Sequence, residues 1–352
     1  MRRLWDFIAR ELRQLLRFNA SERPWQMPLA GGLASGVPIF IGAGLGEVGH
    51  GLVASLGGLV FLYLPATSLS HRMAWLMACA FGLVACYALG ILSHLVLPLR
   101  VPMLAVITVV VTMVCRFYAV APPGSLFFVL AAAIGAYTPA PGLEAVLRVG
   151  LIAMGSVLAV GLAFAYSLHR LRQEAPRPPP APVPDFDFVI LDAFVIGAFV
   201  GLSLALAQLL QLPRPYWVPV SCLAVIQGVS LRAVWTRQVH RTAGTALGVG
   251  VFWALAALPL NAWGVALLIT LLTVVVETLV VRHYGLAVVF ITPLTILLAE
   301  AAHLAGSDPQ ALMQARLLDT VVGSLVGLAG GLFLHSPRCR ALVGPVLRRW
   351  LP

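Results

Sequence analysis

The sequence predicts an all-α integral membrane protein with about twelve transmembrane helices, arranged as two parallel six-helix repeats with both termini in the cytoplasm. The composition carries the membrane prediction, since 60% of the 352 residues are apolar and only 10% are charged. About 25% of residues are charged in a soluble domain, so a soluble globular protein is excluded. The apolar residues also gather in runs that approach the ~20 residues a helix needs to cross a bilayer.

Each apolar run is expected to form one helix. In the first half of the chain the runs cover 27–46, 51–65, 74–96, 101–117, 125–137 and 146–168. In the second half they cover 189–210, 215–230, 239–257, 261–281, 285–302 and 316–335. Several runs are shorter than a full crossing, and we expect those helices to be tilted, broken or re-entrant.

Residues of the same type recur between the two halves. Arg148 and Gly155 precede Arg316 and Gly323 by 168 positions each. Several such matches in one order indicate a duplication of six spans. An even number of spans returns the chain to its starting side, so the two copies are expected to be parallel and related by an axis along the membrane normal.

Proline is concentrated between the halves, in residues 169–188. A proline run favours an extended polyproline II spacer, and it also fits a PxxP ligand for an SH3-like partner. Before the first span, Leu4, Ile8 and Leu12 share one helical face, as in a helix that lies in the membrane interface or clamps a partner subunit. The expected order is therefore an amphipathic cytoplasmic helix over 1–26, a first repeat over 27–168, a Pro-rich cytoplasmic linker over 169–188, a second repeat over 189–335 and a basic cytoplasmic tail over 336–352.

The basic residues indicate the orientation in the membrane. All 23 are arginines. Under this topology 19 of them lie on the side of the termini and the linker, and the other side holds Arg100, Arg148, Arg214 and Arg316. The positive-inside rule places the arginine-rich side in the cytoplasm. We therefore expect a multi-pass protein of the bacterial inner (plasma) membrane, surrounded by the lipid bilayer.

Residue types that are missing from the sequence exclude whole classes of chemistry. No lysine occurs, which excludes a Walker A loop, a kinase phosphate lysine and Schiff-base chemistry. No HExxH motif, Cys/His cluster or nucleophile elbow occurs, and the five cysteines fit buried apolar positions. We therefore expect no enzyme activity, no metal and no cofactor. The net charge of +10 comes from arginines in short loops, so we expect no nucleic-acid partner.

The ionisable residues cluster near the ends of the predicted spans, while the centre holds hydroxyl groups and proline. The central hydroxyl groups belong to Thr108, Thr112, Thr270, Thr273 and Thr292, the last of which precedes Pro293. A lumen lined by threonines, with exposed half-helix N-termini and arginines at its mouths, favours anions. Three carboxylates are candidates for coupling transport to a proton: Glu277, Glu300 and Asp319.

Four segments of the second half carry a family resemblance. They are PYWVPVSCLAVIQG (215–228) followed by Arg237, RTAGTALG (241–248), RHYGLAVVFITPL (282–294) and RLLDTVVGSLVG (316–327). In these segments the sequence resembles the fusaric acid resistance-like (FUSC) family of the aromatic acid exporter superfamily. The first half carries only a weaker echo, GHGLVASLGGL at 49–59.

The resemblance implies a multi-pass inner-membrane transporter that exports aromatic or other organic carboxylic acids, small organic anions at neutral pH. Wider kinship with plant malate channels implies a homodimeric anion channel as an alternative, and some relatives work with a periplasmic adaptor subunit. The resemblance also suggests Asp319 and the following positions along the substrate pathway: Tyr216, Trp217, Arg237, Arg241, Thr245, Arg282, Tyr284, Thr292 and Arg316.

Three functions therefore stay open. The first is an exporter in which mouth arginines attract the carboxylate while Tyr216 and Trp217 bind the ring, although an interfacial aromatic belt explains the same pair. The second is a passive organic-anion channel, which the scarcity of central carboxylates favours. The third is a non-transporting membrane scaffold or a subunit of a larger efflux assembly.

Overall fold

The computed structural model describes residues 15–21, 23–173, 175–300 and 309–350, and these residues contain helices and no strands. The first half of the chain forms α2 (Gln26–Gly44), α3 (Val48–Gly58), which continues as a 3-10 turn over Leu59–Tyr63, α4 (Leu69–Leu92), α5 (Arg100–Phe117), α6 (Leu126–Tyr137) and α7 (Leu143–Leu171). The second half forms α8 (Asp192–Leu209), α9 (Trp217–Ile226), α10 (Leu231–Ala256), α11 (Ala262–Leu279), α12 (Tyr284–Glu300), α13 (Pro309–Leu334) and α14 (Pro337–Trp350). A helix therefore lies at each of the twelve predicted apolar runs.

Seven helices of the described chain are long and apolar enough to cross a membrane. They lie within Gln26–Gly44, Leu69–Leu95, Leu97–Phe117, Leu143–Leu171, Asp187–Leu209, Ala262–Leu279 and Gln310–Leu334. Four further apolar helices are shorter, at Val48–Tyr63, Leu126–Tyr137, Trp217–Ile226 and Tyr284–Leu298. The all-helical membrane class is thus supported, while the number of twelve crossings stays a prediction.

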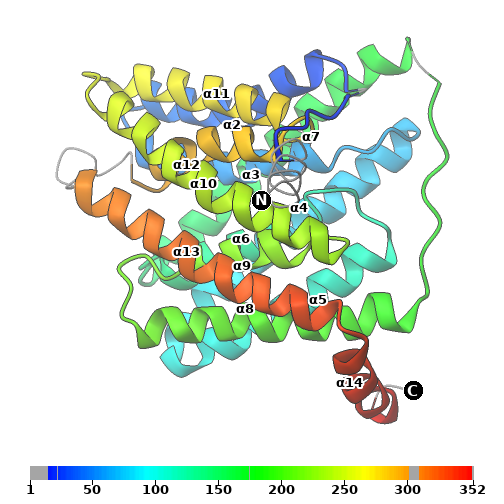
Figure 1. The fold of residues 1–352 in the computed structure, drawn as a ribbon. Coiled ribbons are helices and arrows are strands. Elements are labelled where there is room, and N and C mark those ends of the chain that lie inside the picture. Colours follow the sequence, from blue (N-terminus) through cyan, green and yellow to red (C-terminus); the bar gives the residue numbers. More distant parts are fainter. Residues whose placement is uncertain (1–14, 22, 174, 301–308, 351–352) are drawn as a thin grey trace, which may run out of the picture.

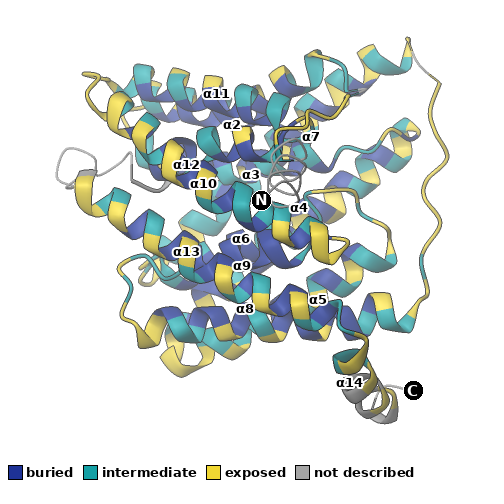
Figure 2. Ribbon diagram, in the orientation of Figure 1, coloured by how far each residue is buried: buried dark blue, intermediate teal, exposed yellow. Residues whose placement is uncertain are grey.

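The outer faces of the bundle carry large apolar side chains. Phe81, Met154 and Trp253 are 77%, 70% and 68% exposed, and Figure 2 shows the buried residues gathered between the helices. Many other large apolar side chains of the described residues are also exposed, whereas extended apolar surface is rare on a soluble monomer. Lipid tails are the solvent that suits these faces, because no polar partner is needed there.

The helix pairs of the first half recur in the second half. Helix α4 packs on α6 as α10 packs on α12, and α3 packs on α7 as α9 packs on α13. Across the halves, α2 packs on α11 as α5 packs on α8, and these two pairs lie at opposite edges of the bundle in Figure 1. Each partner is shifted by six helices, which is the pattern that a duplicated six-helix unit produces.

Glycines allow the close approach of α10 to α12. A Cβ atom at Gly244 would lie 2.8 Å from the Gly285 carbonyl oxygen, and one at Gly248 would lie 2.5 Å from the Val289 carbonyl oxygen. Both distances are too short for a real Cβ contact. Small residues one turn apart therefore let the two backbones meet, as in other membrane helix pairs.

The Pro-rich stretch between the halves is not helical over residues 175–185. It runs along one side of the molecule, from the end of α7 to the start of α8, at the right of Figure 1. The backbone N–H groups of Arg177 and Val183 donate to the carbonyl oxygens of Ala66 and Phe117, at 2.9 and 2.8 Å. We call this the linker side of the molecule. The observed stretch is shorter than the predicted linker, because α7 continues to Leu171.

Both ends of the described chain lie near helix ends of the linker side. The predicted interfacial helix falls mainly on residues 1–14, which lie outside the described residues, and α2 begins at Gln26. The predicted basic tail forms α14. Its Arg340 forms an ion pair with Asp192 at 3.2 Å, and its Arg348 forms one with Asp187 at 2.9 Å. The tail is therefore attached to the start of the second half.

Candidate functional site

A cavity of about 1710 Å³ lies between the helices of both halves. At the linker side its lining includes Arg116, Asp192 and Arg340, and at the opposite side it includes Glu47 and Arg148. The cavity therefore reaches toward both sides of the bundle. Its volume exceeds the 300–1,000 Å³ typical of small-molecule sites, as expected if the space extends along a path.

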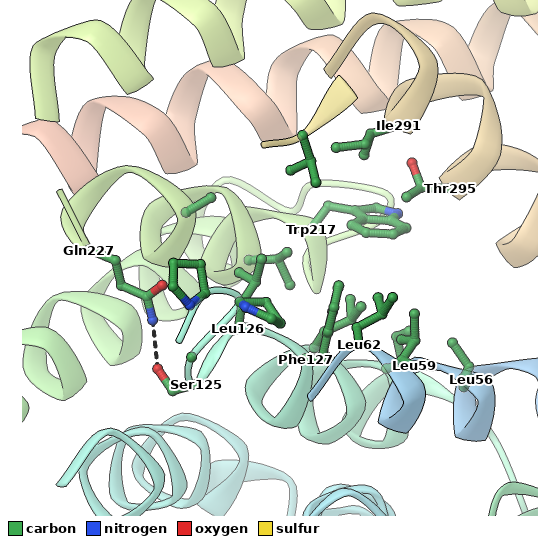
Figure 3. A pocket seen from close by; sticks show the side chains of 18 of the residues that line it. Leu56, Leu59, Leu62, Ser125, Leu126, Phe127, Trp217, Gln227, Ile291 and Thr295 are labelled. Atoms are coloured by element: carbon green, nitrogen blue, oxygen red, sulfur yellow. Dashed lines mark hydrogen bonds between the residues drawn. The ribbon is translucent and has the colours of Figure 1, made fainter. Parts of the chain in front are cut away.

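The middle of the cavity has an apolar and aromatic wall. Figure 3 shows the Trp217 ring pointing into the space, with Ile291 and Thr295 on one side and Phe127 and Leu62 on the other. Trp217 begins α9 in the second half, whereas Leu62 and Phe127 come from the first half. Both halves thus contribute to one wall, which suits the apolar part of a ligand.

A hydrogen bond joins the halves beside this wall. The Gln227 side-chain nitrogen donates to Ser125 Oγ at 2.6 Å, as Figure 3 shows. Thr112 Oγ1 donates to the same Ser125 oxygen at 3.1 Å. Ser125 is 2% exposed, and the two bonds fix the end of α9 against α5 and α6.

Two buried arginines lie on the second-half side of the cavity. Arg316 is 3% exposed, its guanidinium lies 3.9 Å from the centre of the Trp217 ring, and its Nε and Nη1 atoms have no hydrogen-bond partner. Arg241 is 4% exposed and donates from Nη2 to Ser221 Oγ at 3.2 Å, while its Nε has no partner. Each charge lies close enough to act on the other, and the Asp319 carboxylate, three residues further along α13, also acts on Arg316 without forming an ion pair.

The other arginines of the cavity have partners. Arg23 pairs with Glu277 at 3.5 Å, and Arg148 donates to Glu144 at 2.9 Å. Arg116 pairs with Asp192. Within the described ranges, neither Arg241 nor Arg316 has a carboxylate within ion-pair distance.

Burial of a guanidinium group without an ion-pair partner costs up to several kcal/mol. An anion in the cavity offsets that cost, and a carboxylate matches the planar fork of an arginine. The arrangement is therefore suited to an organic anion whose charged end meets Arg241 or Arg316 and whose apolar part lies along the wall.

Helix packing brings these residues together. Trp217 lies on α9, Arg241 on α10 and Arg316 on α13, and α13 packs on both α9 and α10. Glycines on α13 allow the contact: a Cβ at Gly323 would lie 2.9 Å from the Ser221 Cβ, and one at Gly327 would lie 2.5 Å from the Cys222 carbonyl oxygen. Arg316 thus meets the Trp217 ring because α13 has no side chain at these two positions.

The structure brings six of the predicted pathway residues to the cavity. They are Tyr216, Trp217, Arg237, Arg241, Tyr284 and Arg316. Arg237 donates to the Ala224 carbonyl oxygen at 3.3 Å. The predicted coupling residue Glu277 also lines the cavity, and it pairs with Arg23.

The remaining predicted residues lie elsewhere. Thr245 and Thr292 are buried beside the cavity and not in its lining, and Thr292 donates to the Val288 carbonyl oxygen at 2.9 Å. Arg282 is exposed in the turn between α11 and α12. Asp319 is fully buried, outside the lining, and neither carboxylate oxygen has a hydrogen-bond partner. The side chain of Glu300 lies outside the described residues.

The sequence analysis missed the first-half wall and part of the second-half lining. Phe127 and Leu62 carry no motif, so no signal in the sequence distinguishes them from other apolar core residues. Gln227 stands in the PYWVPVSCLAVIQG segment, and its polarity inside an apolar run was a usable signal. Thr295 lies one turn from the predicted Thr292. Thr295 lines the cavity, whereas Thr292 does not.

Residues 202–330 match a family model described as fusaric acid resistance protein-like. This match confirms the resemblance found in the sequence. The fusaric acid resistance-like segment includes Trp217, Arg241 and Arg316, so the two buried arginines and the aromatic ring all lie within it.

A curated relative covers nearly the whole chain. It is the uncharacterized membrane protein YvaC of Bacillus subtilis (strain 168), which is 22% identical over 489 aligned positions that cover 96% of this chain and 77% of the relative. Because the alignment is longer than this chain, the relative carries inserted residues that this chain lacks. No solved structure gives a significant match.

Proposed function

We propose that this protein is a membrane transporter that exports aromatic or other organic carboxylic acids through the central cavity. The observation that carries the proposal is the presence of two buried arginines, Arg241 and Arg316, that face a cavity without a carboxylate partner. The similarity to the fusaric acid resistance-like family and to a membrane protein supports a transporter-type role.

The wall beside the arginines favours an aromatic acid. One face of Trp217 is covered by the Arg316 guanidinium, and Phe127 lies across the space in Figure 3. A flat apolar group binds favourably by stacking on such rings, and a carboxylate binds favourably by pairing with the arginines. A ligand with both a flat ring and a carboxylate makes both sets of contacts, and its affinity is higher for that reason.

The recurring helix pairs support two parallel repeats, and the arginine-rich linker side is proposed to face the cytoplasm of a bacterial inner membrane. In that orientation the inside-negative potential favours outward movement of an anion, by about 2.3 kcal/mol per charge for each 100 mV, and coupled export adds the energy of the pH gradient to it. Export then needs no ATP. A homodimer and a periplasmic adaptor subunit stay predictions.

The proposal is tested by flux in proteoliposomes. A panel of labelled aromatic and aliphatic acids is assayed with and without a pH gradient, for the wild type, Arg241→Ala and Arg282→Ala. Arg282 is the matched control because it is an arginine of the same segment that is exposed outside the cavity. Flux that prefers aromatic acids, falls in Arg241→Ala and persists in Arg282→Ala supports the proposal.

A passive organic-anion channel is the second candidate. It is favoured by the extent of the cavity toward both sides and by the location of Asp319 outside its lining. Flux that needs the pH gradient supports coupled export, whereas flux that is indifferent to the gradient, together with anion conductance, supports the channel. The absence of flux for every acid contradicts both functions and favours a scaffold or a subunit of a larger assembly.

A further inference from the structure

Three aromatic rings form a row between the two halves of the chain. The centre of the Tyr216 ring lies 5.2 Å from that of the Trp217 ring and 6.3 Å from that of the Tyr137 ring of α6. A guanidinium covers each end of the row, because Arg316 lies 3.9 Å from the centre of the Trp217 ring and Arg100 lies 5.0 Å from that of Tyr137. We call these three aromatic side chains the ring row. It extends from the buried Arg316 to a helix of the first half.

The Tyr137 end of the row lies at the side of the bundle opposite the linker side. Helix α5 ends and α8 begins at the linker side, so Arg100 at the start of α5 and Gln208 near the end of α8 lie at the opposite side. The Gln208 side-chain nitrogen donates to the Tyr137 hydroxyl oxygen at 2.6 Å. Arg100 donates from Nη2 to His94 Nδ1 at 2.9 Å. The Tyr137 ring is therefore held by a bond from the second half and by an arginine that is itself positioned.

The ring row lines one end of the cavity, together with arginines. Tyr137 and Tyr216 both contribute to the lining. Arg214 lies in the turn between α8 and α9, two residues before Tyr216, and it lines the same end of the cavity. Arg148 of α7 also lines this end, where it donates to Glu144 at 2.9 Å. We call this end of the cavity the opposite mouth, and it combines aromatic surface with positive charge.

The cavity has room for more than one small acid. Its volume of about 1710 Å³ exceeds the 300–1,000 Å³ that is typical of a single small-molecule site. The buried arginines serve the middle of the cavity, whereas Arg214 serves the opposite mouth. A path that holds an ion at several sites releases it more readily than one deep site does, because each site binds weakly enough for the ion to leave. A second site at the opposite mouth therefore suits a transport path.

We propose that Tyr137 and Tyr216 form a second binding site for aromatic acids at the opposite mouth, with Arg214 as the partner of the carboxylate. The second site rests on the proposed function, in which an aromatic acid binds first at the buried arginines. The ligand ring contacts the tyrosines in an offset or edge-to-face geometry, since Arg100 covers one face of Tyr137. In the proposed orientation the opposite mouth faces away from the cytoplasm, so the acid occupies this site last before its release.

The second site is tested by equilibrium dialysis of labelled benzoate against the full chain in nanodiscs, with empty nanodiscs as the blank. Binding is expected in two saturable phases, and the tighter phase belongs to the buried arginines. Tyr137→Leu is expected to raise the Kd of the weaker phase about two- to tenfold, as for loss of one contact between aromatic rings, and to leave the tighter phase unchanged. Arg214→Gln is expected to raise the same Kd by about tenfold to a hundredfold, as for loss of a charge-assisted hydrogen bond.

Two control variants separate ring binding from a structural role. Tyr137→Phe keeps the ring and removes the hydroxyl that accepts the Gln208 bond, and it is expected to bind benzoate as the wild type does. Tyr118→Leu removes a tyrosine ring that is 46% exposed outside the lining, just beyond α5, and is expected to leave both phases unchanged. A weaker phase that neither Tyr137→Leu nor Arg214→Gln changes overturns the second site. An equal rise of Kd in both phases, or an equal effect of Tyr137→Phe and Tyr137→Leu, also overturns it.

The second site and the proposed function fail separately, because Arg241→Ala is expected to weaken the tighter phase alone. A weaker phase that depends on Tyr137 and Arg214, without flux of any labelled acid, retains the second site and contradicts the transport proposal. A single phase that depends on Arg241, together with flux of benzoate, retains transport and overturns the second site. No binding of benzoate in either phase contradicts both.

Discussion

The Arg316 guanidinium lies 3.9 Å from the centre of the Trp217 ring, inside a cavity that both halves of the chain line. This contact joins the N-terminal half of α13 to the first residue of α9. It places a positive charge on a flat apolar surface, where a desolvated cation–π interaction contributes about 2 kcal/mol. An aromatic carboxylate binds through the same two features, a positive charge for its carboxylate and a flat apolar surface for its ring.

Trp217→Leu is expected to weaken transport of aromatic acids about tenfold while aliphatic acids change little. The substitution keeps apolar volume and removes the ring on which a second ring stacks. Competition assays in proteoliposomes, with benzoate against propionate, measure the ratio. Trp253→Leu is the control, because Trp253 is 68% exposed on the outer face of α10. Equal loss for both acids in Trp217→Leu contradicts ring recognition.

Arg241→Ala is expected to raise the apparent Kd for an organic acid by about tenfold to a hundredfold. A charge-assisted hydrogen bond contributes about 1.5–3 kcal/mol, which corresponds to that range. Arg241→Lys is expected to recover part of the affinity, because a lysine supplies the charge without the planar fork. Calorimetry on purified protein measures both values. An unchanged Kd in Arg241→Ala would show that Arg241 does not bind the acid.

Gly248→Ala is expected to lower the free energy of unfolding by about 1–3 kcal/mol, because the new Cβ meets the Val289 backbone of α12. Gly250→Ala is the control two residues along the same helix, where a Cβ meets nothing within 4 Å. Thermal unfolding in detergent compares the two variants. A Tm for Gly248→Ala equal to that of Gly250→Ala contradicts the close packing of α10 and α12.

Ser125→Ala is expected to lower the free energy of unfolding by about 1–3 kcal/mol. It leaves the Gln227 amide and the Thr112 hydroxyl without their shared acceptor, and an unsatisfied buried polar group carries that cost. Denaturant titration of the variant measures the loss. The variant Ser70→Ala, on the surface of α4, provides the comparison, and equal stability of the two variants would speak against a bond between the halves.

The helices could be predicted from the sequence because a run of apolar residues can be recognised without knowledge of its contacts. The run predicted at 101–117 matches α5 closely, and the run at 125–137 matches α6. Helix ends were less accurate where apolar residues do not mark them, as at α4, which begins at Leu69 and not at 74. That helix begins within a Ser–Leu–Ser–His–Arg stretch, and polar residues of this kind are typical of a loop.

The arginines of the site could be predicted from their motifs, but their contacts could not. Arg282 follows α11 by three residues, so its exposure depends on where that helix ends. Thr295 lines the cavity and Thr292 does not, because the rotation of α12 about its axis decides which face meets the space. Phe127 enters the wall only through packing of the two halves, which no local pattern encodes.

The location of a bound acid tests the central claim most directly. Crystals of the full chain soaked with 4-iodobenzoate give an anomalous iodine signal that marks the ring without reference to activity. We expect the iodine along the wall of Trp217 and Phe127, with the carboxylate directed at Arg241 and Arg316. An iodine signal confined to the outer surface or to the turn at Arg282, with the cavity empty, would contradict the account.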